Sequence, residues 1–227
     1  MESGTERQEG AQPKKRVKGK KKLVVAGVLV AIVVVAGGGL FVWHEQPSFC
    51  AAICHTPMDE YLVTYEQTAG ESGTDKYGES VADTSSMLAV THRASSSEGG
   101  ADAACLDCHV PTIGEQVSEG LNWVSGNYVY PLEERTLSDL VAARGLEDEA
   151  TFCLNESCHN LTRDDLESLT ADMNRNPHSA YHDTQECSDC HKAHRASVND
   201  CASCHPDADT PDSWAKPNAS SRTGGAL

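Results

Sequence analysis

Ten cysteines and five of the ten histidines in this chain repeat one arrangement, in which a pair of cysteines is followed directly by a histidine. The groups lie at 50–55, 105–109, 153–159, 187–191 and 201–205. Two residues separate the cysteines in three of the groups, whereas the first group has three and the third has four. Since no cysteine lies outside the groups, the pattern leaves none for a disulfide framework or a catalytic thiol.

The repeated pattern is typical of covalent haem attachment. Two thiols bond the two vinyl-derived edges of one porphyrin, and the histidine is then held beneath the iron as its proximal ligand. Residues inserted between the cysteines can loop outward, because the step from the second cysteine to the histidine is intact in all five groups. Zinc sites pair two clusters rather than repeating Cys-His five times, and a thioredoxin-type pair needs no following histidine. We therefore predict five c-type haems, attached through Cys50, Cys54, Cys105, Cys108, Cys153, Cys158, Cys187, Cys190, Cys201 and Cys204.

The histidines supply candidates for both axial positions of each iron. The predicted proximal ligands are His55, His109, His159, His191 and His205. Five histidines remain for five sixth positions, and their clustering near the haem groups favours ligation. The predicted distal ligands are His92, His178, His182 and His194.

The first haem has two further candidate ligands. Met58 lies three positions after His55, and a thioether ligand raises the reduction potential relative to two histidines. The alternative is that Met58 only packs in the core of its helix. His44 stays open between an iron ligand, a proton acceptor and a residue that marks the membrane boundary beside Trp43.

An uncharged apolar stretch near the N-terminus predicts a membrane anchor. Residues 23–43 span about 31 Å as a helix, which matches a hydrocarbon core of about 30 Å. A cleaved signal peptide usually has a shorter apolar region and a small-residue cleavage site, which this segment lacks. The basic run at 14–22 indicates that residues 1–22 form a cytoplasmic tail and that everything after Trp43 is extracytoplasmic.

Composition and helix signals define the rest of the chain. We predict a mainly α fold with extensive loops, in which a single transmembrane helix precedes a compact domain, 44–205, organised around five haems. Apolar content is only 39%, so the porphyrins would supply much of the buried mass. Beyond residue 22 there are 10 basic and 31 acidic residues, which makes nucleic-acid binding unlikely on charge grounds. Residues 206–227 are expected to be a flexible tail.

Helix boundaries are predicted from caps and spacing. Helices are expected over 56–70, 81–93 and 112–125, with a loop at 70–79. Thr136 and Thr162 each precede an aspartate by three positions, as in a capping box. The apolar residues that follow these two boxes are expected to contact the core: Leu137, Leu140, Val141, Leu166, Leu169 and Met173.

The ordered motifs over about residues 14–132 resemble the NapC/NirT/NrfH family of membrane-anchored multihaem cytochromes. They are the anchor, then FCAAICHTPMDEYLVTY, then TH at 91–92, then CLDCHVP at 105–111. The resemblance implies quinol oxidation beside the first haem, methionine ligation there through Met58, and His92 as a distal ligand. This chain departs from the family in having five haem groups rather than four, in the longer first and third groups, and in the spacing to Met58.

The leading functional hypothesis is an electron-transfer subunit with quinol dehydrogenase activity. On the family resemblance it would oxidise quinol from the membrane pool, of the menaquinol class, and pass electrons to an extracytoplasmic reductase containing flavin or haem, in anaerobic respiration. Quinol oxidation releases protons, and Asp59, Glu60 and His44 are the candidate acceptors. Two alternatives stay open: a terminal reductase with an open iron position, and an electron wire without quinol chemistry.

Overall fold

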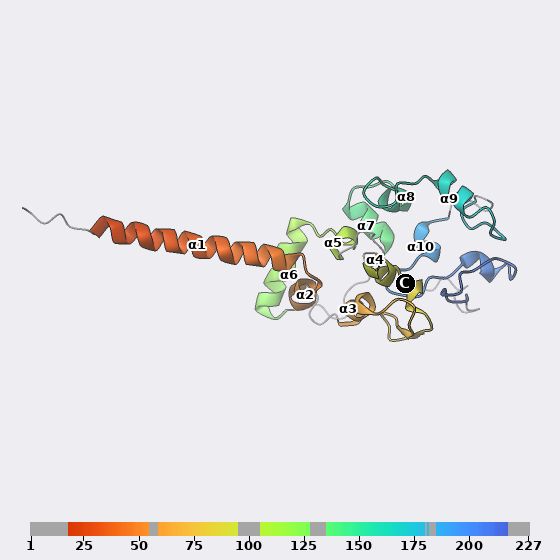
Figure 1. The fold of residues 1–227 in the computed structure, drawn as a ribbon, viewed down its shortest axis with the longest axis horizontal. Helices are drawn as coiled ribbons and strands as arrows, with labels where there is room; N and C mark the ends of the chain where they lie inside the picture. The colour runs from red at the N-terminus through yellow and green to blue at the C-terminus, as the bar shows by residue number, and fades with distance from the viewer. Residues whose placement is uncertain are drawn as a thin grey trace, which may run out of the picture. The chain divides into compact units, whose positions relative to one another are not determined.

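The computed structural model describes residues 18–54, 59–94, 105–127, 135–179, 181 and 185–217. The chain divides into two units, Met1–Trp43 and His44–Leu227. The described part of the second unit consists of short helices joined by turns, with one small two-stranded sheet (Figure 1). The mainly helical architecture predicted from the sequence is therefore present.

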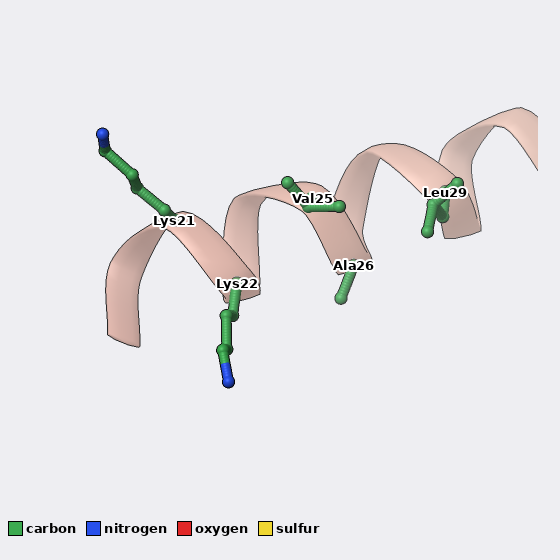
Figure 2. A pocket seen from close by; sticks show the side chains of 5 residues that line it. All are labelled: Lys21, Lys22, Val25, Ala26 and Leu29. Carbon is green, nitrogen blue, oxygen red and sulfur yellow. The ribbon is translucent and has the colours of Figure 1, made fainter. Parts of the chain in front are cut away.

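The first unit is dominated by helix α1 (Lys18–His44), which contains the uncharged stretch 23–43. Its segment Lys21–His44 is long and apolar enough to cross a membrane, and none of that segment is buried within the chain. Figure 2 shows Lys21 and Lys22 extending from the helix just before Val25, Ala26 and Leu29. Residues 18–22 of the basic run and the apolar stretch thus belong to one continuous helix.

Short elements make up the second unit. In chain order they are α2 (Pro47–Phe49), the π-helical turn η1 (Cys50–Cys54), α3 (Asp59–Glu66), β1 (Gly73–Thr74), β2 (Ser80–Val81), the 3₁₀ turn η2 (Thr84–Ser86), α4 (Leu88–Ala94), α5 (Cys105–Cys108), α6 (Ile113–Ser125), α7 (Leu137–Ala143), α8 (Glu149–Cys153), α9 (Arg163–Leu169), α10 (Cys187–Cys190) and the 3₁₀ turn η4 (Asp200–Ser203).

Capping side chains set several helix boundaries. The predicted capping boxes at Thr136 and Thr162 are present, since each threonine accepts from the backbone of Asp139 or Asp165 and the aspartate accepts in return. The helix predicted over 112–125 is confirmed as α6, which begins with the same kind of box. It ends at Gly126, whose φ of 71° is one that glycine adopts without strain.

Two predicted helices are shorter than expected. α3 ends at Glu66 rather than near residue 70, and Arg93 donates to the backbone carbonyls of Tyr65, in the last turn, and of Gln67, just beyond it, each at 2.6 Å. The helix expected over 81–93 begins only at Leu88, because residues before it pair in β2 and form η2. Pairing of β1 with β2 also gives the expected 70–79 loop a two-residue strand.

The polypeptide core is small. One cluster contains Val81, Met87 and Val90, and a second contains Leu140, Val141 and Phe152. The core prediction is confirmed for Leu140 and Val141 but is wrong for Leu169, which is 70% exposed because α9 buries no residue. Few apolar side chains among the described residues are therefore covered by protein alone.

The segment after α10 crosses back onto the first half of the unit. Leu88 and Ala89 at the start of α4 donate their amides to the carbonyls of Lys192 and Ala193, at 2.9 and 3.0 Å. Val198 forms a parallel bridge with Ala215. Residues 206–217, expected to belong to a flexible tail, thus hold defined contacts, while 218–227 lie outside the described residues.

Candidate haem sites

The described Cys–Cys–His groups share one backbone turn. In the three regular groups the histidine amide donates to the carbonyl of the first cysteine, at 2.8–2.9 Å. The third group makes the same bond, from His159 to Cys153, at 3.3 Å. The histidine therefore keeps its place relative to the first cysteine despite two extra residues.

The inserted residues are absorbed in two ways. In the third group, Asn155 forms a local turn in which its side chain accepts from the Ser157 amide at 3.0 Å and its carbonyl accepts from the Cys158 amide at 3.1 Å. In the first group, Cys50–Cys54 forms a π-helical turn, which holds one more residue than an α turn. His55, the proximal ligand predicted for that group, lies outside the described residues.

Three predicted proximal histidines each face a predicted distal histidine. The ring centres are 6.4 Å apart for His109 and His194. They are 6.5 Å apart for His178 and His191, with the rings nearly parallel at 6°. For His92 and His159 they are 5.9 Å apart, with the rings at 85°.

These separations match two imidazoles on opposite sides of one metal ion. A metal–imidazole nitrogen bond of about 2 Å places each ring centre about 3 Å from the metal, so opposed ring centres lie about 6 Å apart. Rotation about the metal–nitrogen bonds leaves this separation unchanged, which accommodates both the parallel and the perpendicular pair. All three pairs therefore have room for an iron between the rings.

The surroundings of one pair lower the pKa of both rings. Burial lowers the pKa of His191, and the nearby His178, His159 and His92 lower it further. Burial and the charge of Arg163 lower the pKa of His178. A neutral imidazole has the unshared electron pair that a metal needs, so both rings are prepared for ligation.

Thiol contacts connect successive groups. The Cys105 thiol is hydrogen-bonded to Cys50, and this contact together with burial raises the pKa of Cys105. The Cys153 thiol is likewise hydrogen-bonded to the Cys187 thiol, and this contact together with burial raises the pKa of Cys153. Cysteines of the second and third groups, and of the fourth and fifth, lie within electrostatic range of each other. The attachment points are thus neighbours in the order of the sequence.

A cleft of about 950 Å³ borders the fifth group. Cys201 and His205 line it together with Met173, Asn174 and Asn176. The volume is within the range of about 300–1,000 Å³ that is usual for cofactor sites. The fifth group therefore faces a space large enough for a prosthetic group.

The donor sets fit haem better than a bare metal ion. Among the described residues, no three His, Cys, Asp or Glu side chains converge to hold a metal ion by themselves. Each ring pair supplies two axial nitrogens, and the other four iron ligands belong to the porphyrin that neighbouring cysteines would attach. The zinc alternative, which needs four protein or water ligands, has no such set in these ranges.

The predicted residues of the quinol end are only partly described. His44 Nδ1 lies 3.1 Å from Glu45 Oε1, and its ring centre is 5.0 Å from that of Phe49. Asp59 and Glu60 begin α3, but their side chains are outside the described part. Met58 and His182 also lie outside it.

Sequence reasoning did not identify three residues beside these sites. Trp214 lies edge-on to His191, with ring centres 5.0 Å apart. The carboxylate of buried Glu149 accepts from the amide and hydroxyl of Ser188, both at 2.7 Å. Thr64 Oγ1 is hydrogen-bonded to His194 Nδ1 at 2.7 Å. A lone tryptophan in a polar C-terminal segment was a usable signal, whereas contacts between distant segments leave none in the sequence.

The chain is similar to known c-type cytochromes. Residues 141–206 match the cytochrome c3 family model, a range that contains the third, fourth and fifth groups. The chain is 60% identical over 195 residues to Cytochrome c-type protein Cgr1 of Eggerthella lenta, which covers 86% of this chain and 87% of the relative. No solved structure matches the chain.

Proposed function

The chain belongs to the family of multihaem c-type cytochromes, and from this premise we propose that it oxidises quinol, of the menaquinol class, and passes electrons through five haems to a reductase. Within that family this makes it a quinol dehydrogenase subunit of the NapC/NirT/NrfH type, serving anaerobic respiration. The reductase would contain flavin or haem and lie outside the cytoplasmic membrane, on the same side as the second unit.

The sequence groups and the ring pairs support an assignment of the residues that would hold the haems. The cysteine pairs would attach them, and the ring pairs His109–His194, His159–His92 and His191–His178 would provide iron ligands. When bound, each haem iron accepts and donates one electron. For the first group we assign His55 and Met58 as ligands, and for the fifth His205 and His182.

The thiol contacts support an order for electron transfer. Cys50 lies against Cys105, and Cys153 lies against Cys187, so the edges at which these groups attach their haems adjoin. Short steps between neighbouring groups favour a route from the first group to the fifth. The acceptor would then dock near η4 and the cleft beside His205.

The observation that carries the quinol assignment is the apolar surface beside the first group. α6 packs against η1, and Ile113, Val117, Leu121 and Val124 follow one face of α6 and are all exposed. Cys50 is seven residues after Trp43, at most about 25 Å of extended chain from the end of the anchor. The exposed apolar stripe beside the first group would suit contact with a quinol.

Quinol oxidation also requires proton acceptors. Two electrons and two protons leave each quinol, and the electrons leave singly. We assign the protons to Asp59, Glu60 and His44. The contact of His44 Nδ1 with Glu45 Oε1 at 3.1 Å supports this role, since an Nδ1–H donated to that carboxylate leaves the Nε2 electron pair to accept a proton.

Reduction of the haems by quinol tests the proposal. The full-length holoprotein in phospholipid vesicles is mixed with a menaquinol analogue, and haem reduction is followed by absorbance, with dithionite defining complete reduction. We expect the quinol to reduce the haems at a rate that saturates with its concentration. Reduction by dithionite but not by any quinol would instead make the protein an electron wire, and a high-spin iron with reductase activity would make it a terminal reductase.

A further inference from the structure

The Nδ1 atoms of the three paired distal histidines all face oxygen atoms. His92 Nδ1 lies 2.8 Å from the carbonyl oxygen of Leu88, one helical turn earlier. His194 Nδ1 lies 2.7 Å from Thr64 Oγ1, and His178 Nδ1 lies 3.1 Å from Thr170 Oγ1. Since a carbonyl oxygen only accepts, His92 carries its hydrogen on Nδ1 and keeps the Nε2 electron pair free.

The contacts of Thr64 assign the same tautomer to His194. Thr64 is fully buried, and its hydroxyl has one hydrogen, which it donates to the Tyr61 carbonyl at 2.7 Å. The hydroxyl oxygen must then accept from His194 Nδ1–H for both short contacts to be hydrogen bonds. The Tyr61 ring adds a second support, edge-on to His194 with centres 5.1 Å apart.

Thr170 imposes the same condition on His178. Its hydroxyl lies 2.7 Å from the Leu166 carbonyl and 2.7 Å from Asn176 Oδ1. Asn176 Oδ1 is itself identified as an acceptor by the His178 amide, which donates to it at 3.0 Å. The single Thr170 hydrogen can be donated to only one of these two acceptors, and the hydroxyl oxygen is then left to accept from His178 Nδ1–H. The His178 ring is also hydrogen-bonded to the Leu166 carbonyl.

Ring separation and tautomer are independent observations that agree. The centre of each distal ring lies 5.9 to 6.5 Å from the centre of a proximal ring. The Nδ1 atom of each distal ring is also hydrogen-bonded. The partner of a ligating histidine's other nitrogen fixes the ring and raises its basicity as a ligand. His44 lacks this combination, because its Nδ1 partner is the adjacent Glu45 and its described ring neighbour is Phe49.

We propose that Thr64 and Thr170 are positioning residues, whose hydroxyl oxygens hold His194 and His178 as the sixth iron ligands opposite His109 and His191. The proposal rests on the proposed haem sites but does not depend on quinol oxidation. An accepting oxygen on Nδ1–H makes the imidazole a stronger electron donor, which stabilises the ferric state. Each hydroxyl therefore lowers the reduction potential of one haem and keeps its sixth position closed.

The test compares Thr64→Val with Thr64→Ser and with Thr84→Val in the full-length holoprotein. Thr84 is a matched control, since it is also fully buried and its hydroxyl donates to a backbone carbonyl, that of Thr68, but to no histidine. The readouts are haem content, a chemical redox titration and carbon monoxide binding to the ferrous protein. None of them uses quinol, so failure of the quinol proposal is seen separately.

We expect Thr64→Val to raise the potential of one haem and to weaken its distal ligand about 10- to 100-fold. Carbon monoxide should then bind at one haem that resists it in the wild type. Thr64→Ser should behave as the wild type, and Thr84→Val should leave all potentials in place. Identical titrations for Thr64→Val and Thr84→Val would overturn the proposal.

Thr170→Val provides the same test at a half-buried position. If Thr64→Val fails to incorporate haem, the potential of the His178 site decides the outcome. An upward shift of one haem in Thr170→Val supports the proposal, and unchanged potentials contradict it. A wild-type protein without attached haem would instead overturn the proposed haem sites themselves.

Discussion

The surface around the first group and the region of the three histidine pairs use apolar side chains in opposite ways. α2 and α6, beside the first group, bury no residue, and α6 exposes a continuous apolar stripe. Around the histidine pairs, two small clusters are covered, and buried threonine and glutamate side chains are hydrogen-bonded. The first arrangement suits exchange with an apolar partner outside the chain, and the second suits fixed ligands.

The largest predicted effect is loss of the fold without haem. The described polypeptide buries only six apolar side chains in its two clusters, and such a small core rarely stabilises a domain of this size. Chain produced without cytochrome maturation should show no cooperative transition in urea by far-UV circular dichroism. A sharp transition equal to that of the holoprotein would show that the pairs are organised by protein alone.

Removing a paired histidine should change the iron it faces. His194→Ala should convert one of the five haems to a high-spin form, seen by electron paramagnetic resonance, because His109 loses the ring opposite it. His44→Ala is the comparison in the other region and should keep every haem low-spin while slowing quinol oxidation. A high-spin signal in His44→Ala, with none in His194→Ala, would reverse the assignment.

A charge on the α6 stripe should impair the exchange role of the first region. Leu121→Asp should slow reduction by quinol roughly tenfold, since burying a leucine-sized surface is worth about 1.5–3 kcal/mol. Ser118→Asp places the same charge elsewhere on α6 at another exposed position and serves as the control. Dithionite reduction should be unchanged in both, and equal quinol rates would remove the stripe from the mechanism.

The smallest effect concerns the acid stability of α6. A hydrogen bond from the Thr112 backbone amide and another from the Arg135 side chain lower the pKa of the Glu115 carboxyl from 4.5 to about 2. A lowered folded-state pKa contributes stability above the unfolded value, which is lost as the pH falls from about 5 to about 2. Glu115 is partly exposed to solvent, which screens the interaction with Arg135, so the contribution should stay below about 1 kcal/mol.

Urea unfolding of Glu115→Gln and wild type at pH 7 and pH 3 measures this contribution. The variant should be less stable at pH 7, and the difference should shrink at pH 3. Asp139→Asn, in the equivalent capping box of α7, is the comparison from the region of the histidine pairs. A difference for Glu115→Gln that grows on acidification would contradict the assigned charge.

Local patterns made part of this structure predictable. The capping boxes at Thr136 and Thr162 involve residues three positions apart, so the sequence contains both partners. The pairing of His109 with His194 was not predictable, because it depends on the return of the segment after α10 to α4 and α3. Thr64 gave no signal for the same reason, since its role depends on a histidine from the far end of the domain.

Boundaries failed where weak local signals met tertiary contacts. The helix expected over 81–93 lost its first residues to the β1–β2 pair and η2. Leu169 has core-like spacing but faces outward, since spacing alone cannot say whether a neighbour covers the face. Trp214 was placed in a flexible tail on composition, yet its ring lies against His191.

The central claim is that all five groups carry haem, including the two with extra residues between the cysteines. The shared bond from His159 to the Cys153 carbonyl is its structural basis in the third group. Intact mass spectrometry of the full chain, from a host competent in cytochrome maturation, counts the haems directly. We expect the mass of the polypeptide plus five haems; the mass of the polypeptide plus three, with haem on the regularly spaced groups alone, would contradict the claim.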